Sequence, residues 1–167
     1  MNMTKVSGGC SMRSLAHQRG FTLIELMVVI ALVAITATIA VPGFNRMIES
    51  NRMTATTNSV IGTLNFARSE AVRRGEPVLV TLAGNGSVQV YVAADLNTLL
   101  RETGALPNGV SLSRDPDADT VFRGNGMMQG NQVRRHYDIC SNNGVSDARV
   151  TVNVGGQTSV NQGAPNC

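Results

Sequence analysis

The longest apolar segment of the chain lies near its start. From Phe21 to Val41 the residues are apolar apart from three threonines and a single charge, Glu25. As an α-helix, these 21 residues would extend about 32 Å at ~1.5 Å per residue. That length matches the roughly 30 Å hydrocarbon core of a bilayer. The segment therefore predicts a helix that is apolar on all sides and long enough to cross a membrane.

A second pattern, with helical periodicity, extends from Phe44 to Arg74. Pro42 lies between the two patterns and lacks an amide donor, so we expect it to kink or locally open the helix. Gly75 is placed as a C-terminal cap, and Pro77 prevents continuation. Apolar or small side chains recur every three or four residues and predict one buried stripe: Thr57, Val60, Leu64, Ala67 and Ala71. Together the two patterns predict one helix of about 54 residues, on the order of 80 Å long.

After Pro77 the periodicity changes to that of β-strands, punctuated by Gly, Asn, Asp and Pro. Gly84-Asn85-Gly86 indicates a hairpin between the first two strands. The predicted strands are 77–82, 88–92, 109–113, 120–123, 133–140 and 148–154, with a weaker one at 158–160. We therefore expect an α+β chain in which the long N-terminal helix, first transmembrane and then amphipathic, packs on an antiparallel β-sheet. Its predicted parts are a leader (1–20), a membrane or filament-core half-helix (21–45) and a head domain (46–167).

The residues before the apolar segment are basic, with Lys5, Arg13 and Arg19 and no acidic residue. This arrangement is compatible with a secretory signal peptide or with a permanent single-span anchor. Basic residues on this side predict that the leader is cytoplasmic and the C-terminal part is translocated. Both alternatives leave Glu25 unexplained, because an ionised carboxylate inside a bilayer costs several kcal/mol unless it is paired.

Residues 20–26, Gly-Phe-Thr-Leu-Ile-Glu-Leu, resemble the leader-cleavage motif of type IV prepilins and type II secretion pseudopilins. The resemblance implies a type IV pilin fold, cleavage after Gly20 by a prepilin peptidase, and N-methylation of the new terminus at Phe21. It also implies an assembly contact, in which Glu25 pairs with the terminal ammonium group of a neighbouring subunit. Buried charge pairs of this kind are good devices for setting register.

The implied cleavage changes the charge of the chain. The full sequence has 14 basic and 11 acidic residues, and the first 20 residues hold three of the basic ones and none of the acidic ones. The remainder carries 11 of each and has no basic excess that would predict bulk nucleic-acid binding.

Two later stretches narrow the resemblance. Residues 64–75 resemble the end of the long helix in the GspH/FimT/FimU group, and residues 137–140 with 148–156 resemble the closing strands of that group. The group contains a minor pseudopilin of type II secretion and minor pilins of type IV pili. Membership implies a subunit that is anchored in the inner membrane by a single span, with a periplasmic C-terminal domain. After assembly it would lie in a cell-surface pilus beside other minor and major pilins.

The cysteines help to distinguish between the minor pilins and the secretion pseudopilin of this group. Cys10 would leave with the leader, so Cys140 and Cys167 remain, an even number in an oxidising periplasm. A bond between them would stabilise the head by roughly 3–4 kcal/mol through loop closure, and a C-terminal disulfide resembles the FimU-type minor pilins. The alternatives are two free thiols, or a nucleophile or metal site in which Cys140 joins His136 and Asp138 on one strand face. No orienting partner for His136 is evident, and we expect no enzyme activity, metal or cofactor.

Two clusters of charged residues have simpler explanations than a binding site. Asp115, Asp117 and Asp119 alternate as calcium ligands do, but the glycine and closing glutamate of such a loop are missing, which favours a solvated acidic turn. Arg134, Arg135 and His136, with Arg123, could form a basic patch; a solvated strand edge explains them as well.

The DNA-binding FimT pilins carry a Gly-Arg-x-Arg motif near the C-terminus. The matching residues here, Gly156 to Ser159, contain no arginine, so DNA binding at this position is not expected. The sequence thus predicts a minor pilin that takes part in initiation or tip assembly of type IV pili and in twitching motility. The alternatives are a minor pseudopilin of type II secretion and a DNA-uptake minor pilin.

Overall fold

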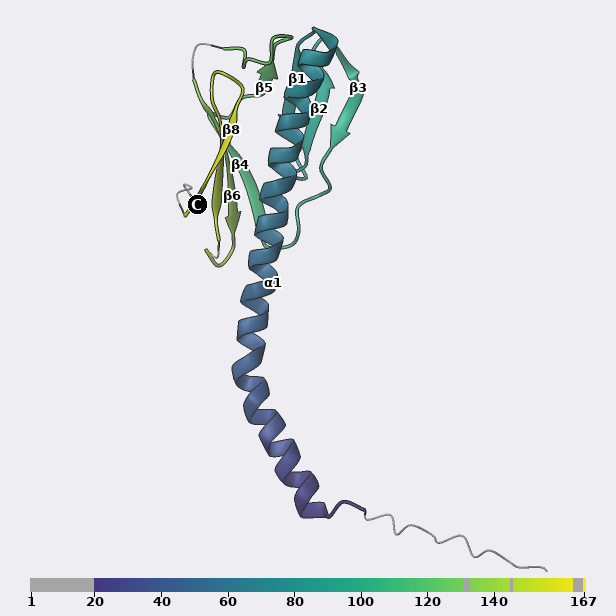
Figure 1. The fold of residues 1–167 in the computed structure, drawn as a ribbon, viewed down its shortest axis with the longest axis vertical. Coiled ribbons are helices and arrows are strands. Elements are labelled where there is room, and N and C mark those ends of the chain that lie inside the picture. Colours follow the sequence, from purple (N-terminus) through teal and green to yellow (C-terminus); the bar gives the residue numbers. More distant parts are fainter. Residues whose placement is uncertain (1–19, 131–132, 145, 164–166) are drawn as a thin grey trace, which may run out of the picture. The chain divides into compact units, whose positions relative to one another are not determined.

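The structure is a computed structural model, and it describes residues 20–130, 133–144, 146–163 and 167. The chain divides into two compact units, Met1–Ala40 and Val41–Cys167. Most of the predicted leader, including Lys5, Cys10, Arg13 and Arg19, lies outside the described residues. The first unit is described from Gly20 onward and consists of helix; the second contains all of the strands (Figure 1).

Helix α1 extends from Leu23 to Arg74, which confirms the single long helix predicted from the two patterns. It ends as predicted, because Gly75 has a φ of 70° and its N–H bonds to the Ala71 carbonyl at 2.9 Å. Pro42 lies inside the helix, and the kink expected there stays a prediction.

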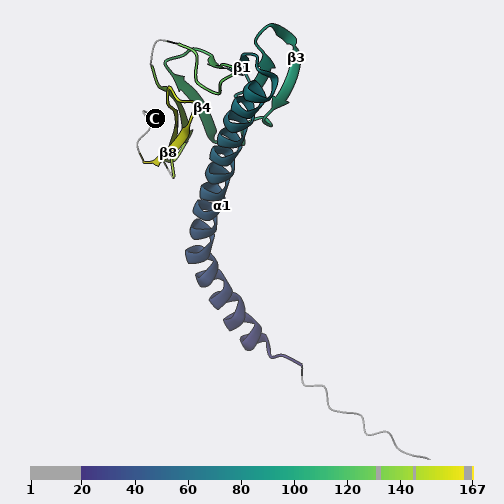
Figure 2. The same ribbon diagram turned by 45° about the horizontal axis from the view of Figure 1, so that its top comes forward.

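In the described part of the chain, eight strands form two four-stranded antiparallel sheets, ordered β3-β2-β1-β5 and β4-β6-β7-β8. The expected packing of the helix on antiparallel β-structure is confirmed, but the strands form two sheets rather than one, because β4 and β5, although joined by a short acidic turn, pair in different sheets. Strands β3 and β8 lie on opposite flanks of the C-terminal half of α1 (Figure 1, Figure 2). The strands are β1 (Val78–Leu82), β2 (Val88–Val92), β3 (Asp95–Glu102), β4 (Val110–Asp115), β5 (Thr120–Phe122), β6 (Arg135–Ser141), β7 (Ala148–Val152) and β8 (Thr158–Gln162).

Strand β3 was missed entirely. Its sequence does not alternate between apolar and polar residues, none of its side chains is buried, and its pairing with β2 contains register shifts. Such an irregular edge strand leaves almost no signal in a hydrophobic pattern. The hairpin predicted at Gly84-Asn85-Gly86 is present between β1 and β2, with Gly86 at a φ of 78°.

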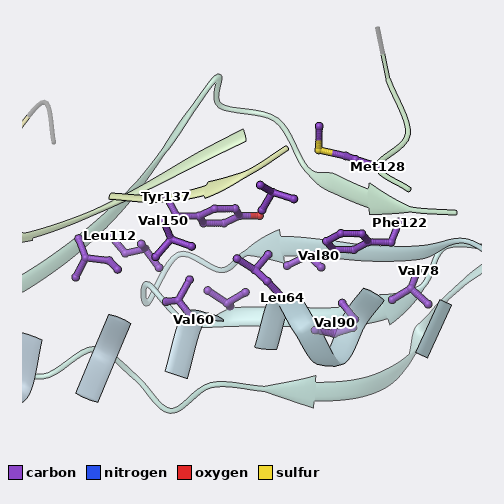
Figure 3. Packing of buried hydrophobic residues seen from close by; sticks show 14 of the residues in the cluster. Val60, Leu64, Val78, Val80, Val90, Leu112, Phe122, Met128, Tyr137 and Val150 are labelled. Atoms are coloured by element: carbon purple, nitrogen blue, oxygen red, sulfur yellow. The ribbon is translucent and has the colours of Figure 1, made fainter. Parts of the chain in front are cut away.

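The core lies between α1 and the inner faces of both sheets. Val60 and Leu64 of α1 lie among Val80 and Val90 of one sheet and Val150 of the other (Figure 3). Among the strand residues, Tyr137 is fully buried and its hydroxyl is 2.8 Å from that of Thr120, which satisfies both polar groups. All five residues of the predicted stripe on α1 are buried, so the helical periodicity identified the packing face correctly.

Candidate processing and assembly site

The segment that carries the predicted cleavage position is exposed and precedes the helix. Gly20 and Phe21 are both exposed, and α1 begins two residues after Phe21. Thr22 caps the helix, because its Oγ1 accepts a hydrogen bond from the Glu25 N–H at 3.3 Å and its carbonyl accepts one from the Leu26 N–H at 3.2 Å. The Gly20–Phe21 peptide bond is therefore held just outside a defined helix start.

The sequence analysis did not single out Thr22. Its signal was nevertheless present, since Thr22 and Glu25 have the Thr-x-x-Glu spacing of a capping box. Glu25 also lies in the first helical turn, where a carboxylate interacts favourably with the helix dipole. Glu25 thus has a local role in the helix start besides any contact with another subunit.

Nothing among the described residues requires a glycine at position 20. A Cβ atom placed on Gly20 would have no described atom within 4 Å, and the residue does not adopt a positive φ. The described part of the chain thus gives no reason for glycine here, which agrees with a requirement set by a molecule that binds the segment, such as a peptidase.

The first half of α1 presents its apolar side chains outward on every side. Phe21 is 83% exposed and Leu23 is 76% exposed, and by length and composition this helix could cross a membrane. The hydroxyls of Thr36 and Thr38 donate to carbonyls of their own helix, so they bring no unsatisfied donor into an apolar environment. So large an apolar surface requires cover by lipid or by neighbouring helices.

At the far end of α1, Glu70 is clamped by two arginines. Its carboxylate accepts hydrogen bonds from Arg73 Nε at 2.9 Å and Arg74 Nε at 2.6 Å. These bonds lower the pKa of Glu70 to about 2, with Arg73 the larger cause. The clamp fixes the last turn of the helix beside the head core.

The three residues considered as a nucleophile or metal site have other partners. Cys140 is bonded to Cys167, which confirms the predicted disulfide and removes the free thiol. The buried carboxylate of Asp138 binds Arg149 through two hydrogen bonds of 2.6 and 2.7 Å, and His136 Nδ1 lies 3.0 Å from Thr151 Oγ1. The arrangement is a strand-to-strand brace on the outer face of β6 and β7.

The acidic turn and the basic residues likewise form no evident site. Asp117 and Asp119 both bind the Arg114 guanidinium, at 3.0 and 2.6 Å, so an arginine occupies the position considered for calcium. Within the described ranges no group of three or more acidic, cysteine or histidine residues could hold a metal ion.

The predicted basic patch is divided between exposed and partly buried residues. Arg123 and Arg134 are exposed, whereas Arg135 begins β6 and is partly buried. The stretch compared with the DNA-binding motif begins at the tight turn between β7 and β8, where Gly156 has a φ of 75°.

Comparison with known proteins gives one family match over most of the head and a second over the N-terminal segment. The family model described as "Type II transport protein GspH" matches residues 56–156. The chain belongs to the GspH family. A second model, "Prokaryotic N-terminal methylation motif", matches residues 15–41. This motif implies processing by a prepilin peptidase and assembly with other pilins.

Proteins with two kinds of name resemble this chain. Two proteins of Pseudomonas aeruginosa named "Fimbrial protein" are each 29% identical over 136 residues, covering 80% of this chain and 86% of the relative. The "Type II secretion system protein H" of Escherichia coli (strain K12) is 42% identical over 63 residues, or 37% of each chain.

The fold itself is that of a pilin. A crystal structure of the type IV minor pilin FimU of Pseudomonas aeruginosa (strain PAO1) superposes with a TM-score of 0.58 and 17% identity. The match covers 68% of this chain and 90% of that chain. The chain thus combines a pilin fold with an N-terminal methylation motif and a helix that could cross a membrane by length and composition.

Proposed function

We propose that this GspH-family subunit is a minor pilin of a type IV pilus that takes part in initiation or tip assembly, and that it thereby supports twitching motility. One observation favours a type IV pilus over a type II secretion system. The likeness to fimbrial proteins extends over 80% of this chain, whereas the likeness to a secretion protein is confined to 37% of it. The C-terminal disulfide supports the same choice.

In this proposal the chain is cut after Gly20 and methylated at Phe21. Residues 21–45 first anchor it in the inner membrane as a single span, with the head in the periplasm, and later join the core of the filament. The outward-facing apolar side chains of this segment support both states, because neighbouring helices and lipid tails are equally apolar.

Glu25 supplies the assembly contact. A terminal ammonium group in an apolar helix bundle is costly unless a carboxylate pairs with it. Glu25 lies in the first turn of α1, one turn from Phe21, so a small axial offset between subunits would bring the two groups together.

A deletion strain tests the proposal. We expect loss of twitching and of surface pili, with secreted proteins at normal levels, and recovery of both when the full gene is restored. Loss of exoprotein secretion with intact pili would refute the pilus assignment and support the second candidate, a type II secretion pseudopilin. That candidate rests on the 42% identity to the secretion protein within its matched region.

DNA uptake is tested separately with the purified head, residues 46–167. All of the core residues fall within this part of the chain, so it contains what it needs to fold. We expect no shift of double-stranded DNA at any salt concentration. A shift that weakens steeply with added salt would indicate phosphate contacts and would revive the DNA-uptake reading.

A further inference from the structure

A groove lined mainly by polar residues lies beside residues 42–49 of α1. It has a volume of about 640 Å³ and is lined by Pro42, Asn45, Arg46, Glu49 and Asn143. We call it the base groove. Four of these residues come from one face of α1, and Asn143 comes from the turn after β6, which lies beside the helix (Figure 1).

The base groove contains one cationic side chain and one carboxylate that do not form an ion pair with each other. Asn143 Nδ2 donates to both carboxylate oxygens of Glu49, at 3.3 and 3.1 Å, which fixes the carboxylate toward the groove. A carboxylate accepts about four hydrogen bonds, so Glu49 keeps acceptor capacity. Arg46 is exposed and forms no ion pair with any residue that the structure describes.

If residues 21–41 span the membrane as proposed, the residues of the groove follow the span at the depth of the lipid headgroups. The apolar segment ends at Val41, and Asn45 and Arg46 follow it by about 6 to 8 Å of helix rise. Headgroups occupy the outermost ~5 to 8 Å on each side of a bilayer. Glu49 is one turn further on, but helical side chains point back toward the N-terminus, here toward the membrane. Phe44 is 63% exposed.

We propose that the base groove binds the headgroup of a zwitterionic aminophospholipid of the periplasmic leaflet, with its phosphate on Arg46 and its ammonium on Glu49. This inference rests on the membrane anchoring in the proposed function. The headgroup would set the depth and the rotation of the subunit in the membrane before assembly.

The charges of the groove select among lipids. A phosphoethanolamine group carries a phosphate for Arg46 and N–H donors for Glu49, and both bonds are charge-assisted. A phosphocholine group has the same charge but no N–H donor. A phosphatidylglycerol headgroup offers only negative charge and hydroxyls, and its phosphate would be repelled by Glu49.

The test is lipid retention by the full chain in native mass spectrometry. The protein is purified in detergent and mixed with equal amounts of phosphatidylethanolamine, phosphatidylcholine and phosphatidylglycerol. We expect adducts with phosphatidylethanolamine to exceed adducts with phosphatidylcholine about three- to fivefold. This ratio corresponds to the interaction energy of a partly exposed charge pair near a membrane. Glu49→Gln should bring this ratio close to one. Arg46→Gln should lower the retention of both lipids and leave their ratio unchanged, because both carry the same phosphate.

Two matched variants serve as controls. Arg134→Gln and Glu76→Gln remove exposed charges of the same types elsewhere on the head, and each should keep the preference. A ratio near one in the wild type, an unchanged ratio in Glu49→Gln, or stronger retention of phosphatidylglycerol would each overturn the inference. Flotation with phosphatidylcholine vesicles distinguishes failure of the proposed membrane anchoring from failure of the proposed lipid site. A chain that does not float refutes the membrane anchoring itself, and a chain that floats without lipid preference refutes only the groove.

Discussion

Loss of the Cys140–Cys167 disulfide is expected to destabilise the head without changing its fold. The bond joins residues separated by 27 positions and ties the end of the chain to β6, the strand that pairs with both β4 and β7. Neither cysteine belongs to the hydrophobic core, so serine at both positions leaves core packing intact. The effect should therefore arise mainly from the greater freedom of the unfolded chain.

The magnitude follows from the size of the closed loop. A loop of this length corresponds to about 3.5 kcal/mol of loop-closure entropy at 25 °C. Measured values commonly fall below this limit, so we expect a loss of about 2 to 3.5 kcal/mol in the free energy of unfolding. For a head of this size this is a large share of the typical ~5–15 kcal/mol total.

The assay is urea unfolding of residues 46–167, followed by circular dichroism. Cys140→Ser, Cys167→Ser, the double variant and the reduced wild type should show the same loss, because each opens the same loop. The far-ultraviolet spectra should match that of the oxidised wild type. A loss below 1 kcal/mol, or clearly different losses in the two single variants, would refute the loop-closure reasoning.

Three further predictions concern the ends of α1. Gly20→Val should block leader removal although a Cβ atom at this position meets no described atom within 4 Å, and a processed band on an immunoblot would contradict this. Glu25→Ala should be processed normally but be depleted from sheared filaments; incorporation at the wild-type level would show that no charge pair is needed. The pKa of Glu70 is about 2 when folded and ordinary when unfolded, so its contribution is present above pH ~4.5 and lost as the pH falls toward 2. Because water screens the exposed Arg73, we expect this contribution to the free energy of unfolding to be about 1–2 kcal/mol. Between pH 6 and pH 3, the denaturation midpoint should therefore fall less in Glu70→Gln than in the wild type. Equal falls in the two proteins would exclude this role of Glu70.

The sequence by itself determined the elements whose signals are local. Twenty-one consecutive residues without a charge other than Glu25 specify an apolar helix whatever surrounds them. The helix stop at Gly75 is equally local, since it needs only a residue that accepts a positive φ followed by a proline. The buried stripe of α1 was readable because a helix repeats every 3.6 residues. The disulfide was predictable because only two cysteines follow the leader.

Tertiary structure decided what depends on contacts between distant residues. The division into two sheets turns on β5 pairing with β1 rather than with its neighbour β4, a choice that no local pattern records. Strand β3 exists mainly through its backbone pairing with β2, since none of its side chains is fully buried and only Leu100 is partly buried against the core. Asp138 became a buried brace only when β7 brought Arg149 beside it. The base groove likewise needs Asn143, which is 94 positions from Glu49, and hydrophobic periodicity carries no information about such a separation.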